Sequence, residues 1–361
     1  MSIIMSDDFT GYGTDDTASA GYLLDAGWGE ASGVYIVPDP DPLAIGNVLD
    51  MVRASTSSRM RYPFNISGAT SVGVSFRLWC VALPTSAVPI IRFQAIDNRF
   101  QGQLVLYPNG AVQFAWGDIY TAGSGPDQGV FFGSPTGPVV TARSWNHFEI
   151  KLLRGYPSTG AMELRFNGVS VLSVTGVGAG SDVGQLGIGS GSEYNIGQRV
   201  QAYIKDLVLW NSLGTQNNDF LGTVQVIGLI PNADVTFPWV PSTGITGFNL
   251  VNNSPPQDSV KFISAISPPP APAVFQLSDL PPSVTSVRAL CPQIRSRKVD
   301  GGDGATQTTL ISGVSNISGG VYNNTTSYAY RQEVFEIDPA TTAPWTPSAV
   351  NAVKLQLNRT I

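Results

Sequence analysis

The sequence predicts an all-β protein of two domains, and three observations support this class. Short segments in which apolar and polar residues alternate recur along the 361 residues. Asn-Gly pairs stand between several of them, and helical periodicity is nearly absent. Alternation with a period of two puts every second side chain on one face of a strand. Many short strands joined by tight turns are typical of sandwiches and jelly rolls.

Residues 1–213 carry most of the alternating segments, so we expect a concanavalin-like jelly-roll sandwich there. Asn109-Gly110 and Asn167-Gly168 each separate two such segments and predict hairpins, because type I′ turns need positive φ at both central residues. The expected strands cover residues 71–80, 104–107, 112–116, 148–152, 162–166, 169–174 and 200–210. The best helical window, 42–53, predicts one or two helical turns.

A polar, turn-rich stretch at 214–218 predicts a domain boundary after Leu213. Residues 214–361 then form a second β-sandwich domain with proline-rich loops, among them 268–272, and 231–247 reads as loop. Its expected strands cover 224–230, 287–291, 308–312, 328–337 and 353–357.

The composition excludes several kinds of partner. Charged residues make up 13% of the chain, the net charge is −6, and no basic stripe is visible, which excludes nucleic acid. No stretch approaches the ~20 apolar residues of a membrane helix, so we expect no membrane insertion. Residues 1–6 do not resemble a signal peptide, which predicts synthesis in a cytoplasm. Cys80 and Cys291 are expected to be small buried hydrophobes.

No catalytic constellation is apparent, so the sequence predicts no enzyme and no cofactor. The single histidine, His147, is expected on the outward side of a strand, at the surface, and no G-x-S-x-G motif accompanies it. A glycosidase needs two facing carboxylates. The nearest cluster, Glu333, Glu336 and Asp338, has the wrong order and lies outside the first domain.

The candidate glycan-binding residues are Trp116, Asp118 and Tyr120, which lie just after an expected strand and before 123–125, a Gly-Ser-Gly segment. Aromatic side chains on loops can stack on sugar rings. The alternative is that Trp116 is a core tryptophan at a strand end.

An acidic group near the start of the chain consists of Asp7, Asp8, Asp15 and Asp16. Carboxylate oxygens are the ligands that Ca²⁺ prefers. The spacing of an EF-hand is absent, so we predict no metal site and interpret the group as a solvated start before the first strand. A bound calcium ion is the open alternative.

Several stretches resemble a family of phage and prophage structural proteins. Residues 6–12 (SDDFTGY) resemble the opening of that family, and 218–226 with 229–231 and Trp239 resemble its junction. Residues 330–339, Trp345 and 349–351 resemble its C-terminal domain. Within the first domain, 145–151 with 162–168, and 204–210, are similar to the central hairpin and closing strand of concanavalin/laminin-G-like jelly rolls.

The resemblance implies a non-enzymatic bacteriophage virion protein on the particle exterior. Both a tail tip, fibre or spike component and a capsid decoration protein fit it. The expected partners are other virion proteins, further copies of this chain in a homo-oligomer, and a host surface glycan. The expected localisation is the virion. The rival interpretation is a stand-alone carbohydrate-binding or carbohydrate-cleaving lectin-like protein.

Overall fold

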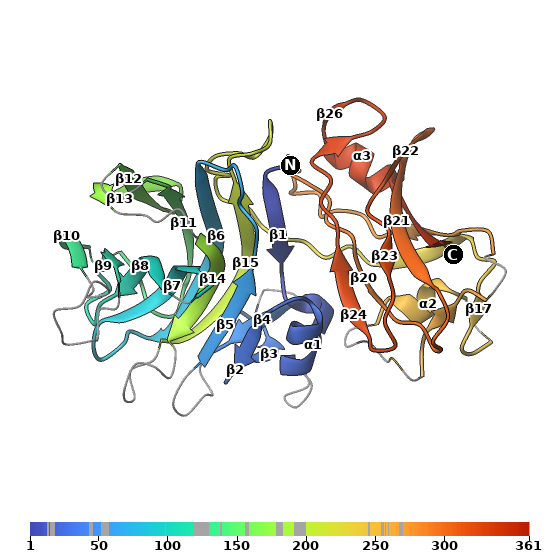
Figure 1. Ribbon diagram of the computed structural model, residues 1–361, viewed down its shortest axis with the longest axis horizontal. Helices are drawn as coiled ribbons and strands as arrows, with labels where there is room; N and C mark the ends of the chain where they lie inside the picture. Colours follow the sequence, from blue (N-terminus) through green and yellow to red (C-terminus); the bar gives the residue numbers. More distant parts are fainter. Residues whose placement is uncertain are drawn as a thin grey trace. The chain divides into compact units, whose positions relative to one another are not determined.

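The computed structural model confirms the all-β fold class: the chain forms antiparallel sheets with only short helices (Figure 1). The structure describes residues 1–12, 14, 19–42, 46–51, 58–97, 99–117, 130–137, 139–155, 159–177, 183–190, 200–244, 246–253, 256, 258, 260–266 and 270–360. Two compact units result. The N-terminal unit holds Ser2–Phe9 and Thr14–Val226, and the C-terminal unit holds Met1, Thr10–Gly13 and Ile227–Ile361.

The N-terminal unit is a sandwich of two antiparallel sheets. The eight-stranded sheet has the order β13-β12-β11-β6-β15-β4-β3, with β1 paired to β15. Its strands are β1 (Ile3–Asp7), β3 (Tyr35–Pro38), β4 (Asn47–Asp50), β6 (Ser71–Ala82), β11 (Trp145–Leu153), β12 (Gly160–Phe166), β13 (Val169–Val177) and β15 (Gln201–Asn211).

The seven-stranded sheet has the order β10-β9-β8-β7-β14-β5-β2. Its strands are β2 (Glu30–Ser32), β5 (Ser58–Pro63), β7 (Val88–Ala95), β8 (Phe100–Leu106), β9 (Val112–Trp116), β10 (Val130–Thr136) and β14 (Val183–Ser190). Strands far apart in sequence pair here, since β14 lies between β7 and β5.

The core lies between the inner faces of the two sheets. Phe76 and Phe148 stack with their ring centroids 5.2 Å apart on the eight-stranded sheet. Phe93 and Phe114 of the seven-stranded sheet are also fully buried. A Cβ added at Gly102 of β8 would come within 2.9 Å of the Met162 Cε in β12, so the sheets pack directly on each other.

Both predicted hairpin turns form, with different geometries. Asn167 and Gly168 have φ of 49° and 83°, as a type I′ turn requires. At the other turn only Gly110 has positive φ, 80°, while the Asn109 side-chain oxygen accepts a hydrogen bond from the Ala111 backbone N–H at 3.0 Å. That turn is therefore stabilised by an asparagine side chain that bonds its own backbone.

The helix expected at 42–53 is wrong, because this segment contains strand β4. Val48 and Leu49 are fully buried, and β4 pairs with both β3 and β15, so tertiary burial decides its structure. The helix in this part of the chain is α1 (Ser19–Asp25), and a 3-10 turn, η1, covers Thr10–Tyr12.

The C-terminal unit is also built from antiparallel strands. Its six-stranded sheet has the order β16-β19-β27-β21-β22, with β23 paired to β21, and three two-stranded pairs accompany it. The elements are β16 (Pro231–Thr236), β17 (Val240–Pro241), α2 (Phe248–Val251), β18 (Ile263–Ser264), β19 (Ala273–Leu277), β20 (Gln293–Ser296), β21 (Ala305–Ser312), β22 (Ser315–Ser318), β23 (Tyr322–Asn323), β24 (Ala329–Gln332), β25 (Ile337–Asp338), β26 (Ala343–Pro344), α3 (Pro347–Ala352) and β27 (Lys354–Thr360).

Several expected strands of this unit are wrong. Residues 224–230 contain no strand, and the strand begins at Pro231, inside the stretch read as loop. Residues 287–291 contribute one isolated bridge, between Leu290 and Phe335. Apolar alternation is present in both stretches, but it predicts a strand only where a partner strand is in reach.

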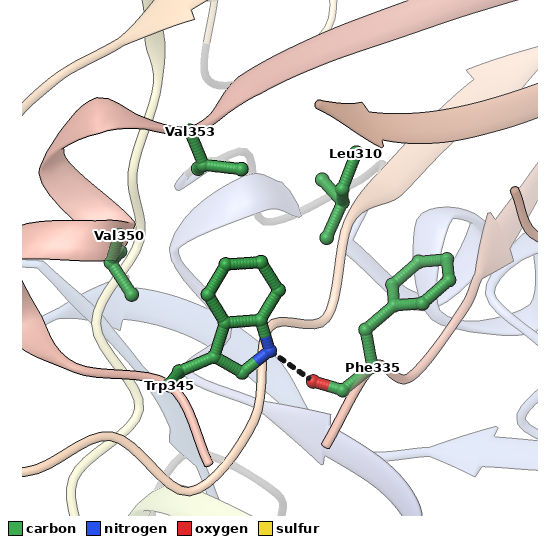
Figure 2. Close-up of a cluster of buried hydrophobic side chains, with 5 residues drawn as sticks. All are labelled: Leu310, Phe335, Trp345, Val350 and Val353. Carbon is green, nitrogen blue, oxygen red and sulfur yellow. Dashed lines mark hydrogen bonds between the residues drawn. The ribbon is translucent and has the colours of Figure 1, made fainter. Parts of the chain in front are cut away.

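Figure 2 shows one hydrophobic cluster of the C-terminal unit, formed by Leu310, Phe335, Trp345, Val350 and Val353. The Trp345 indole Nε1–H donates a hydrogen bond to the Phe335 backbone carbonyl at 2.9 Å. The cluster thus connects α3 to strand β21, and the one polar atom of the indole has its hydrogen-bond partner.

Among the described residues, no helix has the length and apolar character to span a membrane.

Candidate functional site

The outer face of the seven-stranded sheet, turned away from the core, carries a row of mainly polar residues that is interrupted at Gly187 and ends at Ala115. Cross-strand pairing aligns one residue from each of six strands, β2, β5, β14, β7, β8 and β9. These residues are Glu30, Arg61, Gly187, Arg92, Gln103 and Ala115. Five strand-to-strand steps of ~4.8 Å make the row about 24 Å long. We call this row and its neighbours Arg59, Gln94, Gln113 and Gln185 the polar face.

Arg92 lies at the centre of the polar face and is only 3% exposed. Its guanidinium carbon lies 5.4 Å from the ring centroid of Phe100, a cation–π contact. Gln94 follows it on the same side of β7 and is equally buried. A charged side chain is seldom buried to this degree, so the centre of this face is specialised to hold polar or charged groups.

Gln103 is fully buried beside Arg92. Its amide nitrogen donates to the Gly117 carbonyl. Its side-chain oxygen accepts no hydrogen bond within the part of the chain that the structure describes. A buried acceptor without a donor costs about 1–3 kcal/mol, so an orphan of this kind calls for an explanation.

Gln113 and Tyr107 continue the polar face beyond Gln103. The Tyr107 hydroxyl donates to the Gln113 side-chain oxygen, and the Gln113 amide donates to the Gly133 carbonyl. Burial raises the pKa of Tyr107, so its phenol stays protonated at neutral pH and serves as a donor.

At the other end of the polar face, Glu30 of β2 pairs with two arginines of β5. Arg59 donates to its Oε1, and the Arg61 Nε lies 3.3 Å from its Oε2. A pocket of about 490 Å³ opens at this end, lined by Gly29, Glu30, Arg61, Pro63 and Gln185. These side chains are partly exposed, so this is the accessible end of the face.

Gly187 stands between Arg61 and Arg92 in the row. A Cβ at this position would come within 2.6 Å of the Gln94 side-chain oxygen. The absence of a side chain at Gly187 therefore leaves room for the Gln94 amide to lie over strand β14.

The outer face of the eight-stranded sheet is different, because the chain itself covers it. Residues 214–226 pack on this face within the N-terminal unit, so the predicted boundary after Leu213 precedes a segment that belongs to the sandwich. The Glu149 Oε1 accepts hydrogen bonds from the backbone N–H groups of Leu221 and Gly222 at 2.7 and 3.0 Å. We call this the covered face.

Asp206 and Arg165 also contact the covering segment 214–226. The Asp206 Oδ1 accepts from the Val226 N–H at 2.9 Å, and Arg77 lies 3.3 Å from its other oxygen. Burial raises the pKa of Asp206, against the opposing effects of the Val226 hydrogen bond and of Arg77. The Phe220 ring lies under the Arg165 guanidinium, 3.8 Å from its carbon to the ring centroid.

His147 lies on the covered face and is 3% exposed, so the expectation of a surface residue is wrong. Its Nε2 and the Ser75 hydroxyl are 2.9 Å apart. Desolvation by burial, followed by the nearby charge of Arg77, lowers its pKa to about 4. The strand pattern gives the correct side of the sheet, but it cannot show that a later segment covers that side.

The structure places Trp116 at the end of β9, paired with Val130 of β10. Asp118 and Tyr120 lie outside the described residues, so their grouping with Trp116 stays a prediction. The residues that form the polar face were missed in the sequence. The signal that could have found them is the alternation of polar with apolar residues in strands 59–63, 92–94 and 101–103.

The acidic residues of the sequence show local roles where they are described. The Asp7 Oδ1 accepts from the Phe9 N–H at 2.8 Å. Asp15 and Asp16 lie outside the described residues. Over the described part of the chain, no group of three or more His, Cys, Asp or Glu side chains could hold a metal ion. Asp338 accepts from the Ala340 N–H at 3.0 Å, which is a turn contact.

Comparison with known proteins finds no matching family model and no similar curated protein. The resemblance to phage structural proteins therefore stays a prediction. Solved structures with a similar fold include an endo-β-1,4-glucuronan lyase from the fungus Trichoderma reesei, at 13% identity and a TM-score of 0.40, covering 58% of this chain and 95% of that one.

Two further structures belong to the same group. The alginate lyase Aly36B has 15% identity and a TM-score of 0.38, covering 57% of this chain and 95% of that one. The sialidase of Trypanosoma rangeli has 12% identity and a TM-score of 0.35, covering 50% of this chain and 26% of that one. Likeness at this level concerns the β-sandwich fold and assigns no activity.

These comparisons contradict the predicted non-enzymatic virion protein. The three structures are named as two polysaccharide lyases and a sialidase, and none is named as a phage structural protein. The prediction was based on short sequence resemblances and on the absence of a paired-carboxylate motif. That motif describes one kind of glycosidase and says nothing of lyases or of binding proteins, so its absence was too narrow a reason to exclude an enzyme.

Proposed function

We propose that the N-terminal unit is a carbohydrate-active module that binds a glycan chain across the polar face. The observation that carries the proposal is the cross-strand row, in which Glu30, Arg61, Arg92 and Gln103 place polar side chains on four of its six strands. Sugar hydroxyl groups donate and accept hydrogen bonds, and planar amides and guanidinium groups offer both partners in fixed directions. Gln103 and Arg92 are buried, so the partly exposed Glu30, Arg61 and Gln185 are the side chains that a glycan meets first.

The length of the polar face suits a chain rather than a single sugar. A row of about 24 Å offers successive contacts over its six strands. Phe100 and the Tyr107 ring add apolar surface beside the polar groups, a mixture that is typical of small-molecule sites.

A glycan array followed by calorimetry with the best ligand tests this proposal. Arg92→Met keeps the length of the side chain and removes the guanidinium, so we expect glycan affinity to fall at least about tenfold, or about 1.4 kcal/mol. Arg99→Met is the control, because Arg99 pairs with Asp97 at an exposed turn. Failure of the protein to bind any glycan on the array would sink the proposal.

Cleavage of the bound chain is a second candidate, favoured by the burial of Arg92 among amide groups. A guanidinium held away from water stabilises negative charge that develops on a substrate. Glucuronan and alginate, which the names of the similar lyases contain, are the first substrates to assay. Release of new chain ends by the wild type, and its loss in Arg92→Met, would support cleavage. Unchanged polymer length after binding would reject it.

A further inference from the structure

The outer face of the eight-stranded sheet also carries a row of aromatic side chains. Cross-strand pairing aligns Trp145 of β11 with Trp79 of β6 and Tyr203 of β15. The row continues through Asp50 of β4 to Tyr35 of β3. The four rings are partly exposed, whereas Asp50 is only 1% exposed. We call Trp145, Trp79, Tyr203 and Tyr35 the aromatic row.

The covering segment leaves this part of the face partly exposed. Glu149, which anchors the segment, follows Trp145 by four residues on β11, or about 13 Å along the strand. His147 and Glu149 are at most 3% exposed, and Trp145, on the same side of the strand, is more exposed than either. Aromatic side chains gathered on an accessible surface are typical of ligand sites.

Contacts within the face hold two of the rings in place. Trp79 and Trp145 meet edge to face, with their ring centroids 5.7 Å apart. The Lys205 ammonium lies 4.2 Å from the ring centroid of Trp145, a cation–π contact. Trp145 therefore positions Trp79, which pairs with Tyr203 at the centre of the row. Rings that are already fixed lose little conformational entropy when a ligand binds.

The charged groups next to the aromatic row are paired. The Lys205 Nζ lies 2.5 Å from the Asp39 Oδ2, and the Arg77 Nε lies 3.3 Å from the Asp206 Oδ2. Each of these positive charges thus has a carboxylate partner, and the Asp50 carboxylate is buried. The aromatic row therefore offers apolar ring surfaces without an excess of positive charge, which suits a neutral ligand.

We infer that the aromatic row is a second carbohydrate site, which binds a neutral β-1,4-linked oligosaccharide by stacking of its pyranose rings on Trp79 and Tyr203. The faces of a pyranose ring carry C–H groups, and the flat, negative face of an aromatic ring attracts them. Equatorial β-1,4 links make an extended chain, which can follow the three strand steps of about 14 Å in total from β6 to β3. The inference goes beyond the proposed function, because the polar face lies on the other sheet and offers mainly hydrogen bonds.

Calorimetry with cellohexaose, mannohexaose and xylohexaose tests the inference. At least one of them should bind, and raising the salt concentration should leave its affinity unchanged, because the ligand carries no charge. Trp79→Leu should lower this affinity at least about tenfold. Trp79→Phe keeps an aromatic ring and should retain most of it. Tyr203→Leu gives a second variant with a loss in the same direction.

The matched control is Phe262→Leu, because Phe262 is an aromatic residue of the C-terminal unit that is 40% exposed. It should bind as the wild type does, and circular dichroism checks that each variant folds. Arg92→Met, which alters the polar face, separates the two sites. Loss of binding in Arg92→Met, with full binding in Trp79→Leu and Tyr203→Leu, would overturn the aromatic row and leave the polar face as the glycan site. Binding of none of the three neutral sugars would overturn the aromatic row alone, since the glycan array tests the polar face.

Discussion

The two outer faces of the N-terminal sandwich both belong to antiparallel sheets, but they differ in whether a segment of the chain covers them. The covered face is closed by residues 214–226, and the buried carboxylates of Glu149 and Asp206 accept backbone N–H groups of that segment. On the polar face Gln103 is as deeply buried, yet its side-chain oxygen has no donor among the described residues.

The difference lies in the covering segment rather than in complete pairing, because the buried His147 Nδ1 of the covered face also has no hydrogen-bond partner among the described residues. On the covered face, carboxylates anchor a segment of the chain, so losing one leaves backbone N–H groups without their acceptor. On the polar face no described segment is anchored in this way. Mutations of polar residues on the covered face should therefore lower the free energy of unfolding, whereas mutations on the polar face should lower the affinity for glycans.

The largest effect is expected at Glu149. Glu149→Ala leaves two backbone N–H groups without their charged acceptor, at ~2 kcal/mol each, so the free energy of unfolding should fall by about 4 kcal/mol. Urea denaturation measures this. Glu163→Ala on the adjacent strand β12 is the control and should cost below about 1 kcal/mol, since its ion pair with Arg165 is partly exposed, at 31% and 37%. If both variants lost the same free energy of unfolding, residues other than Glu149 would hold the covering segment 214–226.

A second test uses pH. His147, the single histidine, has a pKa of about 4 in the folded protein against 6.5 in the unfolded chain. Between these values the unfolded chain binds the proton first, so stability is complete above pH 6.5 and is lost as pH falls towards 4, by up to about 3 kcal/mol.

The matched variant for the pH test is His147→Gln, which cannot titrate. Its stability should fall less steeply than that of the wild type between pH 6.5 and 4 in urea denaturation. Parallel curves would show that His147 is not the group responsible.

On the polar face the expected effect is on binding. Gln103→Leu removes the orphan acceptor and also the amide that donates to the Gly117 carbonyl. These two changes oppose each other, so stability should change by less than about 1 kcal/mol while glycan affinity falls about tenfold. Gln307→Leu in the C-terminal unit is the matched control, because its amide also donates to a glycine carbonyl, that of Gly319. A large loss of stability in Gln103→Leu, with unchanged binding, would make the polar face structural.

The smallest effect is expected at the edge of the covered face. Lys151 pairs with Asp219 at 2.8 Å, and the Asp219 side chain is 62% exposed. The positive charge of Lys151 contributes to the lowered pKa of Asp219. Lys151→Ala should reduce the free energy of unfolding by about 0.5 kcal/mol, and high salt should remove that difference. A loss comparable to that of Glu149→Ala would place the main anchor of the segment at its exposed edge.

The local sequence pattern predicted those features of the fold that depend on neighbouring residues alone. The hairpin at Asn167-Gly168 could be predicted because the turn residues determine the backbone there. The segment at 42–53 could not, because β4 exists through its pairing with β15, a strand about 150 residues later.

The candidate site lies beyond local pattern for the same reason. Alternation in 59–63 or 92–94 shows which side chains share a face, but Arg61 and Arg92 meet only through β14, which pairs with both strands. The order of strands in a sheet depends on long-range packing. The predicted residues Trp116, Asp118 and Tyr120 are neighbours in the sequence. The polar face, in contrast, consists of residues that are far apart in the sequence and that only the pairing of strands brings together.

The orientation of the row has a consequence for the length of the ligand. A chain lying along it crosses the strands, and it meets a new strand about every 4.8 Å. The sheet then works as a ruler: each added sugar reaches the next strand, from the Glu30 pocket towards Ala115, until the six strands are used. Affinity would grow in steps and then level off, at a ligand size fixed by the number of strands rather than by any single side chain.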